Sequence, residues 1–242
     1  MSQPKITILY QDDHLLAVDK PAGILTIPDR FDPEIPNLME ILTPSFGQLF
    51  TVHRLDKYTS GVNIFARNAE VHRALSMAFE GRDVEKYYYA IVDGTPVPES
   101  GRIEIPLAES TVTRGKMLVH PRGKMSVTEY KTIHAFRHFT LLYLRIYTGR
   151  MHQIRVHMQY LGTPLIVDSL YGRRDAFYLS EVKGKKFHLG KYQEEKPMLV
   201  RQPLHAAKLV FTHPAYKTTV SVEAPLPKDM RAVIQQLEKW GA

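Results

Sequence analysis

The sequence predicts an α+β fold, in which a mixed and largely antiparallel sheet is flanked by helices and loops. Strand-length apolar runs outnumber segments with helical spacing, which favours a fold organised around a sheet. No repeat of 20–50 residues is visible, and no linker is long enough to split the chain. We therefore expect residues 1–242 to form one domain, and a chain of 242 residues can bury a proper core.

The expected strands are runs rich in branched and aromatic residues that end at turn residues. The clearest is "KYYYAIVD", which Gly94 closes, and "HFTLLYLRIY" alternates over its length. Pro21 and Gly23 bend the chain after the second strand, and residues 29–36 are rich in Asp and Pro and predict a loop. Strands are expected at 5–10, 14–19, 62–66, 86–93, 138–147, 204–212 and 217–223.

The expected helices show apolar stripes and capping residues. Asn37 predicts the cap of a short helix through about Ile41, and Asn68 predicts the cap of a helix over 69–80 that Gly81 ends. A third helix is expected from Gly149 to Leu161, and a fourth over about 228–240. The third helix carries one stripe of Met151, Ile154, Met158 and Leu161.

Composition narrows the function classes. The formal charge of +7 suits a polyanionic partner such as nucleic acid, although many soluble proteins carry a similar excess. The chain has no cysteine, which excludes disulfides, thiolate nucleophiles and iron–sulfur clusters. It shows no signal pattern and no apolar run near the ~20 residues that span a bilayer, so we expect a cytoplasmic protein without membrane contact.

Two stretches predict basic loops that either form solvated surface or contact phosphate groups. Residues 114–124 hold four basic side chains and no acid. Residues 173–197 hold seven Lys or Arg against four acids, and we expect a basic insertion over about 173–200.

Metal and phosphate-loop chemistry find no support. His152 and His157 are five apart, which on a helix places them about 140° apart around the axis, so they cannot hold one ion from one face. HExxH, GxxxxGK[ST], GxGxxG and GxSxG patterns are all absent from the sequence. We expect neither a metal nor a cofactor.

The stretch "TVHRLDKYTSG" surrounds one carboxylate, Asp56, with basic and hydroxyl side chains. If residues 52–56 are extended, Arg54 and Asp56 share one face, and nearby cations would lower the pKa of the carboxyl. An ionised carboxylate is a candidate nucleophile or base. A structural salt bridge explains the same spacing.

Five blocks in order resemble the RluA-type family of RNA pseudouridine synthases. "HRLDKYTSG" matches the family signature HRLDxxTSG, and four further blocks match its other motifs. These are "KPAG" at 20–23, "KYYYAIVDG" at 86–94, "TGRMHQIRVHMQYLGTPL" at 148–165 and "LHAAKLVFTHP" at 204–214. The likeness covers most of the chain. It is nearest to short members that consist of the catalytic domain without a separate N-terminal RNA-binding domain.

The resemblance implies that specific uridines of ribosomal RNA, transfer RNA or both are isomerised to pseudouridine without a cofactor. It assigns Asp56 as the catalytic carboxylate, which either attacks the anomeric carbon or abstracts a neighbouring proton. It maps Tyr88 to the aromatic residue that stacks on uracil or helps to deprotonate carbon five, and a phenol with a normal pKa near 10 favours stacking. It maps Arg155 to the cation that pairs with Asp56. It further implies substrate-binding positions at Arg54, which fills the gap of a flipped-out base, and at His53, Thr59, Lys86, Arg150, His152 and Gln153.

Two positions depart from the family pattern. Met151 stands where Thr or Ser is usual, and Val167 replaces the Gly of the usual GDxxYG. Two other functions stay open. One is a non-catalytic RNA-binding or remodelling protein with the same fold, and the other is a cofactor-free nucleoside hydrolase, for which a second carboxylate is missing. We expect an RNA partner and a monomer.

Overall fold

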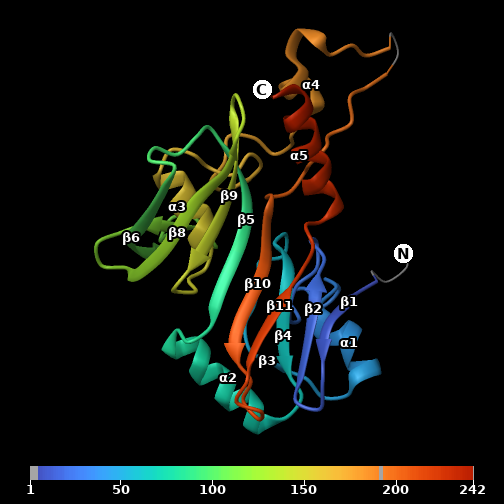
Figure 1. The fold of residues 1–242 in the computed structure, drawn as a ribbon, viewed down its shortest axis with the longest axis vertical. Helices are drawn as coiled ribbons and strands as arrows, with labels where there is room; N and C mark the ends of the chain where they lie inside the picture. Colours follow the sequence, from blue (N-terminus) through green and yellow to red (C-terminus); the bar gives the residue numbers. More distant parts are fainter. Residues whose placement is uncertain (1–4, 191–192, 242) are drawn as a thin grey trace. The chain divides into compact units, whose positions relative to one another are not determined.

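The computed structural model describes residues 5–190 and 193–241. Within this part of the chain, eleven strands belong to a mixed sheet in which antiparallel pairs predominate, and five α-helices accompany them. The predicted α+β fold class is confirmed. The chain divides into two compact units, which we describe one at a time (Figure 1). Unit 1 comprises the residues up to Tyr88 and His205–Pro225, and unit 2 comprises Tyr89–Leu204 and the residues from Leu226.

Unit 1 is built on four neighbouring strands in the order β1-β2-β4-β10. Strand β4 pairs with β2 in the antiparallel sense and with β10 in the parallel sense. The short strand β3 pairs with β4, and β11 pairs with β10. The strands of unit 1 are β1 (Thr7–Gln11), β2 (Leu15–Lys20), β3 (Phe50–Thr51), β4 (Ser60–Ala66), β10 (Leu204–Thr212) and β11 (Thr219–Glu223).

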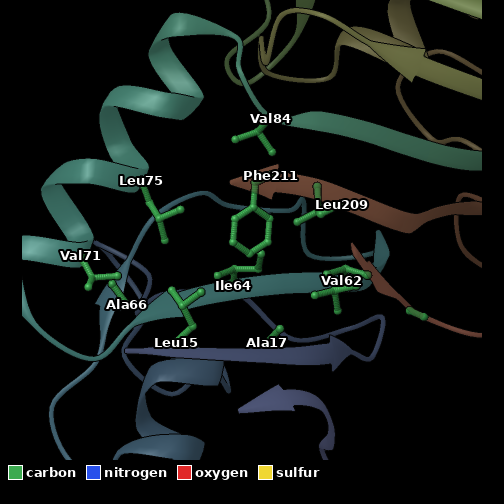
Figure 2. Packing of buried hydrophobic residues seen from close by; sticks show 12 residues of the cluster. Leu15, Ala17, Val62, Ile64, Ala66, Val71, Leu75, Val84, Leu209 and Phe211 are labelled. Carbon is green, nitrogen blue, oxygen red and sulfur yellow. The ribbon is translucent and has the colours of Figure 1, made fainter. Parts of the chain in front are cut away.

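The two helices of unit 1 begin where the capping residues predict. Asn37 accepts a hydrogen bond from the Glu40 amide at the start of α1 (Leu38–Phe46), and Asn68 accepts one from the Val71 amide at the start of α2 (Ala69–Gly81). Figure 2 shows how α2 contributes to the core: its apolar side chains meet those of β2, β4 and β10. The labelled members are Leu15, Ala17, Val62, Ile64, Ala66, Val71, Leu75, Val84, Leu209 and Phe211.

Unit 2 contains strands in the order β5-β9-β8-β6-β7, with β5 entering from unit 1. The bounds are β5 (Glu85–Asp93), β6 (Ser100–Glu109), β7 (Met117–Val119), β8 (Lys124–Ala135) and β9 (Phe139–Ile146). Its helices are α3 (Gln153–Tyr160), α4 (Leu179–Lys183), the short 3₁₀ turn η1 (Gly184–Lys186) and α5 (Lys228–Trp240). Met230, Val233 and Leu237 of α5 are fully buried in a core cluster with Ile91 of β5.

The structure corrects several sequence expectations. The predicted basic loop at 114–124 contains β7 and the start of β8, and β6 was not predicted at all. Two features hid these strands: β6 carries Pro106, and polar residues interrupt the apolar alternation of β8. The loop at 173–197 contains α4, and Lys191 of that loop lies outside the described residues.

Helix ends were also misjudged. Helix α1 runs past Ile41 and includes Pro44. Gly81 is still helical, and Arg82 takes the left-handed capping conformation with φ 68°. Helix α3 is shorter than predicted because His152, with φ 53°, precedes it in the left-handed region. Met151 is therefore an exposed turn residue and does not belong to a buried stripe.

Candidate active site

The Asp56 loop links β3 to β4 in unit 1. Leu55 of this loop is buried, Arg54 is exposed and Asp56 is half-buried. The backbone turns at Lys57 and Tyr58, and the Thr59 amide donates to the Asp56 carbonyl over 3.0 Å. A tight turn thus follows the carboxylate immediately and fixes the backbone that carries it.

The segment of the "KPAG" block holds this loop on both sides of Asp56. Lys20 is 0% exposed, and its ammonium donates to the carbonyls of Ile24 (2.7 Å), Lys57 (3.0 Å) and Pro21 (3.1 Å). A buried ammonium needs such acceptors because water cannot solvate it. Sequence reasoning missed this role, although a lysine at the end of an apolar strand was a visible signal.

Backbone contacts complete the attachment. The Gly23 amide donates to the Lys57 carbonyl over 2.8 Å, and the Leu55 amide donates to the Thr26 hydroxyl over 3.2 Å. Leu55 and Lys57 are the two neighbours of Asp56 in the chain. The carboxylate is therefore carried by a residue whose flanking peptides are tied to one segment.

Ser60 and Gly61, which follow the turn, begin β4. Gly61 has φ +113°, and a Cβ atom there would lie 2.1 Å from the Ala206 carbonyl oxygen of β10. The Ser60 hydroxyl donates to Nδ1 of His205, because Nε2 of the same ring donates to the Ala224 carbonyl. This serine therefore serves the packing of β4 against β10.

His53 lies inside the fold of unit 1. Its Nε2 accepts the Ile64 amide proton over 3.1 Å, and its ring stacks on Phe79 at 4.9 Å between centroids. Burial, and then the charge of Lys86, lowers the pKa of His53 to about 3. The imidazole is neutral at pH 7 and ties the Asp56 loop to β4.

Lys86 and Tyr88 lie on one face of β5. Both are buried, at 6% and 7% exposure. The Lys86 ammonium donates to the Val84 carbonyl over 3.1 Å and lies 5.5 Å from the centre of the Phe79 ring. Burial raises the pKa of Tyr88, and the negative charge of Asp56 raises it further. The phenol is thus neutral at pH 7 and feels the field of the carboxylate.

Arg155 lies in α3 of unit 2 and is 4% exposed. Its Nε and Nη2 donate to the two oxygens of Asp168 over 2.6 and 2.8 Å, and its guanidinium lies 4.9 Å from the Tyr171 ring centre. Such a fork fixes both the plane and the charge of the guanidinium. Asp168, in "VDSLYG", is a site residue that sequence reasoning missed. The pair of Arg155 with Asp56 joins residues of the two units and stays a prediction.

The turn before α3 is held by Gln153, which is 3% exposed. Its Oε1 accepts from the Thr148 hydroxyl and the Arg150 amide, and its Nε2 donates to the Val127 carbonyl and the Thr128 hydroxyl. All the hydrogen-bonding capacity of this amide is used within unit 2. Next to it, Nδ1 of His152 lies 2.8 Å from the Tyr171 hydroxyl, which also accepts from the Met117 amide.

Three observations bear on other kinds of site. In residues 5–190 and 193–241, no group of three or more His, Asp or Glu is placed to hold a metal ion. His157 is fully buried, and burial lowers its pKa to about 4. Among the helices described, none is long and apolar enough to cross a membrane.

Comparison with known proteins identifies the class. A profile described as RNA pseudouridylate synthase matches residues 14–160, which is more than half of the chain. The protein belongs to this family, and it is an isomerase that converts uridine in RNA to pseudouridine.

Relatives extend the match over nearly the whole chain. "Ribosomal large subunit pseudouridine synthase D" of Xanthomonas campestris pv. campestris is 36% identical, over 98% of this chain and 71% of the relative. "Dual-specificity RNA pseudouridine synthase RluA" of Escherichia coli K12 is 35% identical, over 92% of this chain and 94% of the relative. The solved structure of "Human RNA Pseudouridylate Synthase Domain Containing 4" has a TM-score of 0.74 and 25% identity, over 96% of this chain and 93% of that one. The predicted RluA-type resemblance is confirmed.

Proposed function

We propose that Asp56 is the catalytic carboxylate of this pseudouridine synthase. The observation that carries the proposal is the attachment of its loop, because both neighbours of Asp56 are bound to residues 23–26 and a buried ammonium holds the Lys57 carbonyl. Such attachment pre-organises a reacting group. Asp56 is half-buried, so a uridine that has left its stack can reach it.

In the proposed reaction, the bond between uracil N1 and the anomeric carbon breaks and a new bond forms from carbon five. The proton of carbon five leaves to solvent and N1 takes up a proton from solvent, so the composition is unchanged and the change is an isomerisation. Asp56 acts on the sugar, either by attack on the anomeric carbon or by abstraction of a neighbouring proton. Tyr88 is buried and neutral, and its ring packs against the uracil. A phenol with a raised pKa is a poor proton acceptor at pH 7, so we assign it no proton transfer.

The other site residues fall into two groups. Arg54 is exposed and can stack on the bases beside the position that the flipped-out uridine leaves. The buried Thr59 hydroxyl has no hydrogen-bond partner among the described residues, so it can bind a polar group of the nucleotide. His53, Lys86 and Gln153 use their polar atoms within the fold, and we assign them the support of the site. Arg150 and His152 lie in the turn before α3 and stay proposed RNA contacts.

The proposed substrate is ribosomal RNA, transfer RNA or both. The similar proteins carry names of both kinds, one for the large ribosomal subunit and one for dual specificity. The net charge of +7 and the basic residues of 114–124 and 173–197 suit a phosphate backbone. We expect the catalytic domain to span the chain and to act as a monomer in the cytoplasm.

Tritium release tests the proposal. RNA transcribed with tritium at carbon five of uridine loses the label to water when the base is rejoined through that carbon. Wild type should release tritium from large-subunit ribosomal RNA or bulk transfer RNA, while Asp56→Asn should release none. Asp83→Asn, an exposed aspartate after α2, is the matched control and should keep wild-type release. Release by Asp56→Asn would refute the assignment, and no release by folded, RNA-binding wild type would favour the non-catalytic alternative.

The basic loop of unit 2 has a test of its own. Exchange of Lys183, Lys185 and Lys186 for Glu should weaken RNA binding, because nearby phosphates would then meet three negative charges. Unchanged binding in a filter assay would remove this loop from the RNA footprint.

A further inference from the structure

The only tryptophan of the chain, Trp240, lies among three lysine ammonium groups in unit 2. The Nζ atoms of Lys183, Lys239 and Lys186 lie 4.8, 5.2 and 5.9 Å from the centre of its ring. The lysines come from two segments, since Lys183 ends α4, Lys186 ends η1 and Lys239 precedes the tryptophan in α5. We call these four residues the Trp240 cluster.

The fold brings the two segments together through apolar packing. Val182 of α4 packs against the core cluster that contains Val233 and Leu237 of α5. Figure 1 shows α4 beside the C-terminal end of α5. The cluster therefore belongs to a packed part of unit 2, and the apolar packing of α4 against α5 brings its lysines together.

Local acids do not balance this charge. None of the three lysines has an ion pair within the described part of the chain. Glu181, the acid of α4, is 3.2 Å from Arg174 and accepts the Tyr178 amide instead. Glu238 and the C-terminal end of α5 together offer about one and a half negative charges, which is less than the three ammonium groups carry. The cluster thus keeps an excess of positive charge around one flat ring.

We propose that the Trp240 cluster binds a nucleotide of the RNA outside the active site, with its phosphate between the lysines and its base stacked on the indole. Single-stranded nucleic acid offers both groups that the cluster lacks, an anion and a second aromatic face. The inference rests on the proposed RNA substrate, and it names a segment other than the one that holds the target uridine. In this proposal, Lys183, Lys186 and Lys239 bind the phosphate, and Trp240 stacks on the base.

The fluorescence of the single tryptophan reports on this cluster alone. A 12-nucleotide oligoadenylate is the probe, because it has no uridine to be isomerised. We expect it to quench the Trp240 emission of wild type. The K183Q/K186Q double variant should need at least about tenfold more probe. Lys228→Gln is the matched control at the opposite, N-terminal end of α5, about 17 Å away along the helix axis, and it should bind like wild type.

Stacking is separated from simple charge attraction by two further measurements. The anisotropy of labelled oligoadenylate should show binding about tenfold or more weaker for Trp240→Ala, in line with the loss of one stacked base, and Trp240→Phe should recover most of it. Inorganic polyphosphate of similar charge should quench less than oligoadenylate. Equal quenching by the two probes, or equal binding by wild type and the Ala variant, would overturn the base contact.

The outcomes distinguish this inference from the proposed function. Tritium release by wild type together with unchanged emission on addition of oligoadenylate would overturn the cluster and leave the reaction intact. Quenching that depends on Lys183 and Lys186 supports the cluster whether or not Asp56 is the catalytic group, because the probe cannot react.

Discussion

Gly61→Ala should destabilise unit 1 far more than an ordinary Gly→Ala change at positive φ. The new Cβ would lie 2.1 Å from the Ala206 oxygen, and β4 and β10 would have to separate by about 0.9 Å before it reached 3.0 Å, below which real Cβ atoms are essentially never found. That shift strains the parallel pairing and the contact between Ser60 and His205. We expect about 1–3 kcal/mol from the backbone conformation and a further ~1–3 kcal/mol from the forced separation.

Gly47→Ala is the matched control, because Gly47 also has positive φ, +72°, and a Cβ atom added there would meet no other atom within 4 Å. It should lose only the conformational part. Urea unfolding measures both variants, and an extra loss of about 2 kcal/mol moves the midpoint by about 1 M when the slope is near 2 kcal/mol per M. Equal midpoints for the two variants would refute the argument that close approach of β4 to β10 requires a glycine at position 61.

The remaining predictions concern charge. Asp168→Asn should cost about 3 kcal/mol or more in urea unfolding, because it leaves the buried charge of Arg155 without its carboxylate; an unchanged midpoint would contradict the fork. His53 and His157 have lowered pKa values in the folded state, so the unfolded state binds more protons at acidic pH. Their contribution to the free energy of unfolding is therefore complete above pH 6.5 and is lost as the pH falls toward about 4 for His157 and about 3 for His53. Urea midpoints should fall between pH 7 and pH 5, and His53→Gln should fall less. RNA affinity should decrease steeply from low to moderate salt, and a flat filter-binding slope would exclude a phosphate footprint.

The sequence predicted best those elements whose periodicity and caps agree. Asn68 and its apolar stripe defined α2, and β10 and α5 begin and end where their patterns predict. It failed for β6 to β8, where polar residues interrupt the apolar alternation. These strands depend on pairing with distant neighbours, which no local pattern records.

The candidate site was predicted as a set of residue types but not as a set of contacts. "HRLD" and "KYY" pointed to Asp56 and Tyr88. Burial, and then the charge of Asp56, raises the pKa of the Tyr88 phenol. Asp168 could not be found, because its role depends on the approach of α3 to a segment 13 residues further along the chain. Lys20 was missed although it ends an apolar strand, since a lysine in a sequence is expected to be exposed.

The proposed reaction explains why some motif residues support the loop of Asp56 while others contact the RNA. The proposed reaction needs one ionised carboxylate at a fixed position, and a flexible loop would leave it in many positions. Several polar residues in these motifs accordingly form hydrogen bonds within the protein: His53 with the Ile64 amide, Lys20 with three carbonyls and Gln153 with the turn before α3. Arg54, Thr59, Arg150 and His152 are the motif residues to which we assign contacts with the RNA. Recognition of the RNA then also draws on residues outside these motifs, which is the role that we assign to the Trp240 cluster.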